Sequence, residues 1–80
     1  MDLTTTATAL TIVDGNDTIL DVAFLQVSGF AKLGTRMLVI YFGNFEYKLA
    51  YNEVESYNGG APPSFNAFYT ALRALWIAKM

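Results

Sequence analysis

The side chains that could do chemistry in this chain are few, and their types point away from catalysis. The sequence contains no histidine and no cysteine, so it cannot form the Ser/His or Cys/His pair that activates a nucleophile. Three carboxylates, Asp14, Asp17 and Asp21, lie close together and could supply an acid and a base of the glycosidase kind. Two of them flank Gly15-Asn16, however, and Asp and Asn are ordinary turn residues. We therefore expect a turn at this point and a protein that is not an enzyme.

The same acidic segment also offers oxygen ligands for calcium. It lacks the spacing of an EF-hand loop and a glutamate at the twelfth loop position, so the turn explains it better. A phosphate-binding loop is not expected either, because Gly59-Gly60 precedes prolines instead of a Lys-Ser/Thr pair. The sequence predicts no metal site and no cofactor.

Charge and hydropathy limit the partners and the location. The formal net charge is −2 with five Lys and Arg residues, which is the wrong sign for binding phosphates, so we expect no nucleic-acid partner. The longest apolar run, Met37 to Phe42, is far shorter than the ~20 residues that span a bilayer. The first residues carry neither a basic region nor an apolar export segment. We expect a protein that is neither secreted nor membrane-bound, and that is cytoplasmic or assembled into a larger particle.

The composition favours association with other protein chains. Of the 80 residues, 54% are hydrophobic and only 15% are charged. A domain of this size buries only about 60 to 65% of its unfolded surface, which leaves apolar surface outside the core. The chain has no Cys or His set for disulfides or zinc. A protein partner, and most simply a homo-oligomer, is the expected source of extra stability.

Strand and turn signals fill residues 4–51 of what we interpret as a single domain, 1–80. Gly-Asn pairs separate strand-like runs twice, which is typical of tight hairpins. Another strand, with a bulge near Ser28-Gly29, lies between the hairpins and turns at Gly34-Thr35. The expected fold is α+β, with a four-stranded antiparallel meander that has room for a fifth short strand. The predicted runs are Thr4 to Val13, Thr18 to Phe24, Leu25 to Leu33, Met37 to Phe42 and Phe45 to Tyr51.

The second hairpin indicates two different faces. A two-residue loop at Gly43-Asn44 would pair Phe42 with Phe45, Ile40 with Tyr47 and Leu38 with Leu49 on the core face. The opposite face would pair Tyr41 with Glu46, Val39 with Lys48 and Met37 with Ala50, and it is half apolar. This uncovered face is the predicted contact surface, and its candidate residues are Phe30, Met37, Val39 and Tyr41.

A loop over 52–63 and a helix over 64–79 complete the prediction. Ser64 is placed to cap the helix, which should pack on one face of the sheet. Its apolar stripe consists of Phe65, Phe68, Tyr69, Leu72, Leu75 and Trp76, followed by Lys79. A second row of small residues is explained either by helix propensity or by close approach of another helix or backbone. That row is Ala67, Ala71, Ala74 and Ala78.

The order of residue types from Leu38 onward carries a family resemblance. It runs Leu38-Val39-Ile40-Tyr41, a tight turn, Tyr47-Lys48-Leu49, Tyr51-Asn52-Glu53-Val54, a loop, and a helix that opens with Ser-Phe. This order resembles small uncharacterised proteins of Bacteroidetes genomes and their tailed phages, some of which are virion components. The ending is also similar to the last part of bacterial pleckstrin-homology-like domains. The resemblance rests on residue types without a diagnostic motif, so it carries over no functional residue.

Together these observations predict a non-enzymatic structural or assembly protein. The resemblance implies a small phage virion component that packs as repeated copies through the exposed sheet face. The alternative is a small soluble inhibitor or adaptor that uses the same face to bind one specific protein target.

Overall fold

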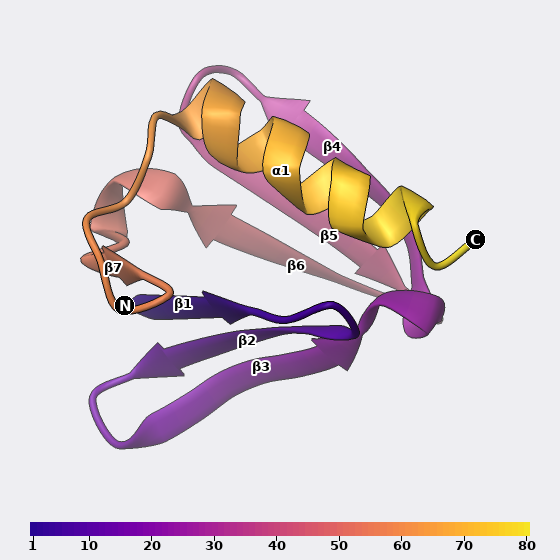
Figure 1. Ribbon diagram of the computed structural model, residues 1–80, viewed down its shortest axis with the longest axis horizontal. Helices are drawn as coiled ribbons and strands as arrows, with labels where there is room; N and C mark the ends of the chain where they lie inside the picture. Colours follow the sequence, from indigo (N-terminus) through magenta and orange to yellow (C-terminus); the bar gives the residue numbers. More distant parts are fainter.

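The computed structural model describes all 80 residues as an α+β fold with seven strands in two sheets and one C-terminal α-helix (Figure 1). Two short 3₁₀ helices, η1 and η2, connect strands. The elements are β1 (Asp2–Thr5), β2 (Ala9–Asp14), β3 (Asp17–Ala23), η1 (Phe24–Gln26), β4 (Val27–Leu33), β5 (Met37–Phe42), β6 (Phe45–Ala50), η2 (Tyr51–Glu53), β7 (Ser56–Tyr57) and α1 (Phe65–Ile77). The helix is neither long nor apolar enough to cross a membrane.

The prediction of one four-stranded antiparallel meander is wrong. Sheet A has the strand order β3-β2-β1-β7 and is mixed, because β1 pairs parallel with β7 and antiparallel with β2. Sheet B has the order β4-β5-β6 and is antiparallel throughout. The two sheets form the lower and upper parts of the view in Figure 1.

An unpredicted turn accounts for one of the extra strands. The expected strand Thr4 to Val13 is divided into β1 and β2 at residues 6–8. There the Thr6 hydroxyl accepts hydrogen bonds from the backbone N–H groups of Thr8 and Ala9, at 3.2 and 3.1 Å. The Thr6 side chain thus stabilises by hydrogen bonds a turn in which Gly or Asn is more usual.

A second break separates the sheets. The expected strand from Leu25 begins only at Val27, because η1 turns the chain from β3 in sheet A to β4 in sheet B. The predicted bulge near Ser28-Gly29 is confirmed, since the β4–β5 register shifts between Val27 and Gly29.

Both predicted hairpins are confirmed. Gly15 and Gly43 have φ of +62° and +57°, which is the left-handed conformation that glycine adopts without strain. The predicted register of β5 and β6 is confirmed at every pair, from Met37↔Ala50 to Phe42↔Phe45.

The helix begins and packs as predicted. The Ser64 hydroxyl accepts a hydrogen bond from the Ala67 backbone N–H at 3.2 Å and caps the first turn. Phe68 and Leu72 are fully buried, and the Trp76 indole N–H donates to the Val27 carbonyl at 3.0 Å. The helix therefore lies on the inner side of sheet B, against one core that both sheets share. The buried core residues are Leu3, Leu10, Ile12, Val22, Phe24, Val27, Leu38, Ile40, Leu49, Tyr51, Val54, Phe68 and Leu72.

The segment predicted as a loop, 52–63, contains the rest of η2 and the short strand β7. It is fastened to β1 by side chains as well as by strand pairing. The Asn58 amide accepts from the Thr5 N–H at 2.7 Å and donates to the Thr5 hydroxyl at 3.0 Å. The N-terminal threonine segment thus completes its sheet within the same chain.

Candidate protein-binding surface

The outer face of sheet B lies opposite the face that α1 covers. The strand registers place its residues in three rows that run across β4, β5 and β6. The rows are Leu33, Met37 and Ala50; Ala31, Val39 and Lys48; and Gly29, Tyr41 and Glu46. We call these residues the outer B surface, together with Phe45, which pairs with Phe42 on the opposite face but lines the same hollow at the adjoining turn.

The four candidate contact residues do not share one environment. Tyr41 is 39% exposed and Met37 is half-buried, both on the outer B surface. Val39 lies on this face as well, but it is only 1% exposed and is outside the main core cluster. Val39 therefore has almost no exposed surface that a partner could contact.

The placement of Phe30 on this face is a wrong prediction. Phe30 pairs with Ile40, whose side chain is in the core, so Phe30 points to the inner face. There its ring meets Trp76 edge-on, with ring centroids 5.4 Å apart. The bulge at Val27 to Gly29 shifts the alternation of β4 by one residue, and the sequence alone did not fix that register.

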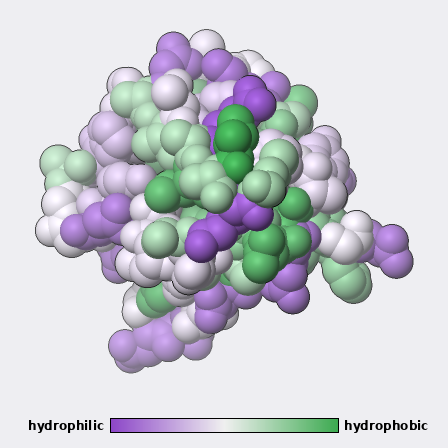
Figure 2. All heavy atoms as spheres, turned by 45° about the vertical axis from the view of Figure 1, so that its right-hand side comes forward, coloured by the Kyte–Doolittle hydropathy of each residue, from purple (hydrophilic) through white to green (hydrophobic).

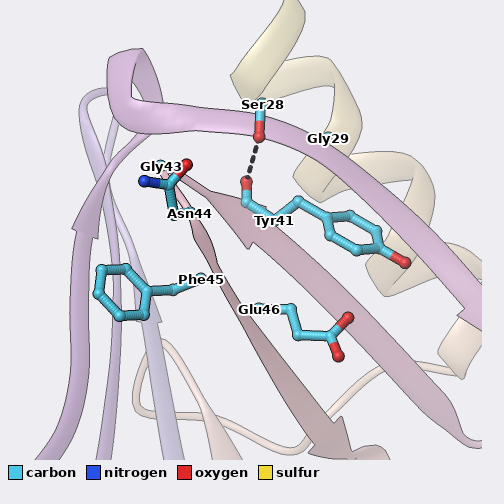
Figure 3. A pocket seen from close by; sticks show the side chains of 7 residues that line it. All are labelled: Ser28, Gly29, Tyr41, Gly43, Asn44, Phe45 and Glu46. Atoms are coloured by element: carbon cyan, nitrogen blue, oxygen red, sulfur yellow. Dashed lines mark hydrogen bonds between the residues drawn. The ribbon is translucent and has the colours of Figure 1, made fainter.

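A shallow hollow of about 560 Å³ lies at the turn end of the outer B surface. Figure 3 shows the Tyr41 and Glu46 side chains pointing to the same side of the sheet, with Phe45 reaching away from the turn. The Ser28 hydroxyl donates to the Tyr41 carbonyl at 3.1 Å. A Cβ on Gly29 would lie 3.9 Å from the Tyr41 ring, so the ring rests against a residue without a side chain. The lining residues are Ser28, Gly29, Tyr41, Gly43, Asn44, Phe45 and Glu46.

Phe45, like Leu33, is a surface residue that the sequence interpretation missed. It was expected in the core opposite Phe42, and their ring centroids are indeed 6.2 Å apart. Phe45 is nevertheless 71% exposed, because the tip of the hairpin extends past the core. Its position directly after the Gly43-Asn44 turn was the signal that could have placed it at the surface.

Other large apolar side chains emerge at the same end of the molecule. Leu25 in η1 and Met80 at the C-terminus are 77% and 78% exposed. Figure 2 brings this end forward and shows apolar residues interspersed with polar ones. This end of the molecule is therefore mixed in character.

Ionisable groups with shifted pKa values lie on the inner side of the sheets, away from the outer B surface. Burial raises the pKa of the Tyr47 hydroxyl above 10.0, and the nearby carboxylates of Glu53 and Asp14 raise it further. No group of three or more His, Cys, Asp or Glu side chains is placed to hold a metal ion.

Comparison with known proteins adds no relative. No family model, no curated protein and no solved structure matches this chain.

Proposed function

We propose that this chain is a non-enzymatic structural or assembly protein that binds protein through the outer B surface. The observation that carries the proposal is the exposure of Tyr41 at 39% and Phe45 at 71%, which both line one hollow, and of Leu33 at 51%, which lies at the other end of the same sheet. Tyrosine and other aromatic residues supply much of the binding energy in protein interfaces.

Energetics support a partner at this surface. Full burial of a side chain such as Phe or Leu contributes about 1.5 to 3 kcal/mol. A single exposed Leu would need no explanation. Two such residues at one hollow, Tyr41 and Phe45, beside a backbone that Gly29 and Gly43 leave accessible, favour a surface that is covered in use.

The assembly that we propose is a phage virion in which the chain packs in repeated copies. The support for the virion is the resemblance of the segment from Leu38 onward to small phage proteins. The support for repeated copies is the amount of apolar surface that an 80-residue chain leaves outside its core.

The second candidate function is an inhibitor or adaptor for one specific protein target. The polar lining of the hollow favours it, because the Ser28, Asn44 and Glu46 side chains could orient a single partner by hydrogen bonds. Such a protein would remain a monomer until its target is present.

The test is the mass of the protein in solution, measured by light scattering over a concentration series at low and moderate salt. We expect oligomers that grow with concentration, and we expect Tyr41→Asp with Phe45→Asp to reduce them, because two carboxylates would then be buried unpaired. Asn52→Asp is the control: it adds one of the two negative charges at an exposed residue of η2 and should leave the mass unchanged.

Two outcomes would contradict the proposal. A monomer at every concentration would exclude self-packing and make a pull-down for a heterologous target the next step. Oligomers that are insensitive to the Tyr41 and Phe45 substitutions would remove the outer B surface from the proposal.

A further inference from the structure

The basic side chains of this protein all lie outside sheet A. Residues 1–26, which form β1, β2, β3 and η1, contain four aspartates and no lysine or arginine. All five basic residues come later, on or beside sheet B and α1. The one ion pair joins the Met1 ammonium to Glu55, so none of the five basic side chains is paired with a carboxylate in the chain.

The outer face of sheet A is acidic. The residues of β1, β2 and β3 that alternate with its buried residues lie in two rows across the sheet, and they carry two carboxylates and no cation. The rows are Asp2, Val13 and Thr18, and Thr4, Thr11 and Asp21. Four of these six residues are exposed and the other two are half-buried. We call them the acidic face.

The outward side of α1 has the opposite charge to the acidic face. This side carries small residues with Arg73 among them, and all are exposed: Ala67, Thr70, Ala71, Arg73, Ala74 and Ile77. Beside it, the Lys32 ammonium and the Arg73 guanidinium lie 4.9 and 5.9 Å from the centre of the Tyr69 ring. A shallow hollow of about 300 Å³ lies next to Arg73 and Ile77. We call this side of α1, with Lys32, the basic face.

We propose that the acidic face of one copy binds the basic face of a second copy. This inference rests on the proposed function, in that copies of the chain pack together, and it adds a second contact between copies that is separate from the one through the outer B surface. A helix packed on a sheet is a common way to bury both elements, and alanines let the helix approach closely. Ile77, 51% exposed, supplies apolar area to the contact. The charges select the pairing, whereas exposed ion pairs alone add little affinity.

The geometry makes this contact head-to-tail. In Figure 1, β3 lies at the bottom of the molecule, while α1 and β4 lie at the top. A copy that uses its acidic face keeps its basic face free for another copy. Contacts of this heterologous kind generate a ring or an open chain, not a closed pair. The outer B surface is left free, and Glu46 and Lys48 give it one charge of each sign.

Two double variants of the full chain test the proposal, each first checked for the wild-type circular dichroism spectrum. Asp2→Lys with Asp21→Lys makes the acidic face positive, and Lys32→Glu with Arg73→Glu makes the basic face negative. Either variant alone should associate about tenfold more weakly than wild type, because like charges then meet. An equimolar mixture should regain the wild-type mass in light scattering at moderate salt.

The control is Asp14→Lys with Asp17→Lys. It changes the net charge by the same amount as the acidic-face variant, but its residues are a cross-strand pair at the β2–β3 turn, off the acidic face. It should associate like wild type, and adding the basic-face variant should lower the mass of its oligomers, because that variant binds through its intact acidic face but cannot extend the chain through its reversed basic face. If wild type forms oligomers but the equimolar mixture of the acidic-face and basic-face variants does not, the inference is overturned and the proposed function stands. A wild-type monomer would remove both.

A cysteine pair tests the contact without any change of charge. The chain contains no cysteine, so Thr11→Cys with Ala74→Cys places one thiol on each face. Mild oxidation should give a ladder of linked species on a denaturing gel, while either single variant should give no more than a dimer. If oxidation of the double variant gives only dimers, the proposed head-to-tail contact is contradicted.

Discussion

Tyr51 shows how one side chain joins the loop, the helix and the core. It is 8% exposed, and its ring stacks on Phe68 with centroids 4.8 Å apart. Its hydroxyl donates to the Pro63 carbonyl at 2.7 Å, at the entrance to α1. Burial raises the pKa of this hydroxyl above 10.0, and Tyr57 raises it further. Neutral Tyr51 therefore stabilises the fold.

Replacing Tyr51 tests this at the residue scale. Tyr51→Phe should lower the free energy of unfolding by about 1 kcal/mol at neutral pH, the usual value of one hydrogen bond. Because the folded pKa is raised, the contribution of Tyr51 is fully present below the unfolded pKa and is lost as the pH rises through the folded one. Urea melts between neutral and alkaline pH should show a shallower alkaline loss for Tyr51→Phe than for wild type. Equal losses in both proteins would contradict the assignment.

Elements whose signals are local could be predicted from the sequence, and those that depend on distant partners could not. The Gly43-Asn44 turn fixes the β5–β6 register by itself, and Ser64 with the apolar stripe fixes α1. The Thr6 turn lacked Gly, Pro and Asn, so β1 and β2 were merged into one strand. The parallel pairing of β1 with the two-residue β7 has no signature in either segment.

The residues of the outer B surface could likewise be predicted only where the signal was local. Tyr41 and Met37 followed from the hairpin register, which is a local property. Phe30 required the register of β4 across its bulge, and Val39 required knowledge of how closely its neighbours pack. Phe45 was misplaced because strand alternation describes the face of a residue but not where the core ends.

Two glycines of the outer B surface should respond differently to the same substitution. Gly43→Ala should cost about 1 to 2 kcal/mol, because an alanine at φ +57° is strained even though nothing lies within 4 Å of its Cβ. Gly29→Ala should be tolerated, since its Cβ would make an ordinary 3.9 Å contact with the Tyr41 ring. Thermal melts of both variants give the comparison. A Gly29→Ala loss as large as that of Gly43→Ala would refute this account of the hollow.

At the scale of the whole molecule, the segment between β6 and α1 attaches to the β1 edge of sheet A. β7 extends sheet A beyond β1, and the Ser56 hydroxyl donates to the Asp2 carboxylate at 2.7 Å. Asn58 follows in a left-handed conformation, φ 52°, and makes two hydrogen bonds to Thr5. Asn58 is the one non-glycine residue with positive φ, a conformation that Asn adopts more readily than most residues.

Two substitutions separate the roles of Asn58. Asn58→Gly removes the side-chain hydrogen bonds but suits the left-handed backbone, and it should cost about 1 kcal/mol. Asn58→Ala removes the same hydrogen bonds and keeps a Cβ without the polar group that lets Asn adopt this conformation, so it should cost about 1 to 2 kcal/mol more. Chemical denaturation of both variants measures the difference. Equal costs would mean that the backbone conformation at this position carries no strain.

The β1–β7 pairing also sets the order in which this protein can fold. Asp2 and Ser56 are 54 positions apart, so sheet A cannot be completed until most of the chain has been collapsed or synthesised. Contacts of such separation require a large loss of chain entropy before they return any energy, and they slow folding. The three-stranded hairpin unit β1–β3 and the β4–β6 unit are the parts that form from local contacts. Until β7 arrives, the edge of β1 is open to pairing with any other chain, which is the stage at which this protein is most exposed to misassembly.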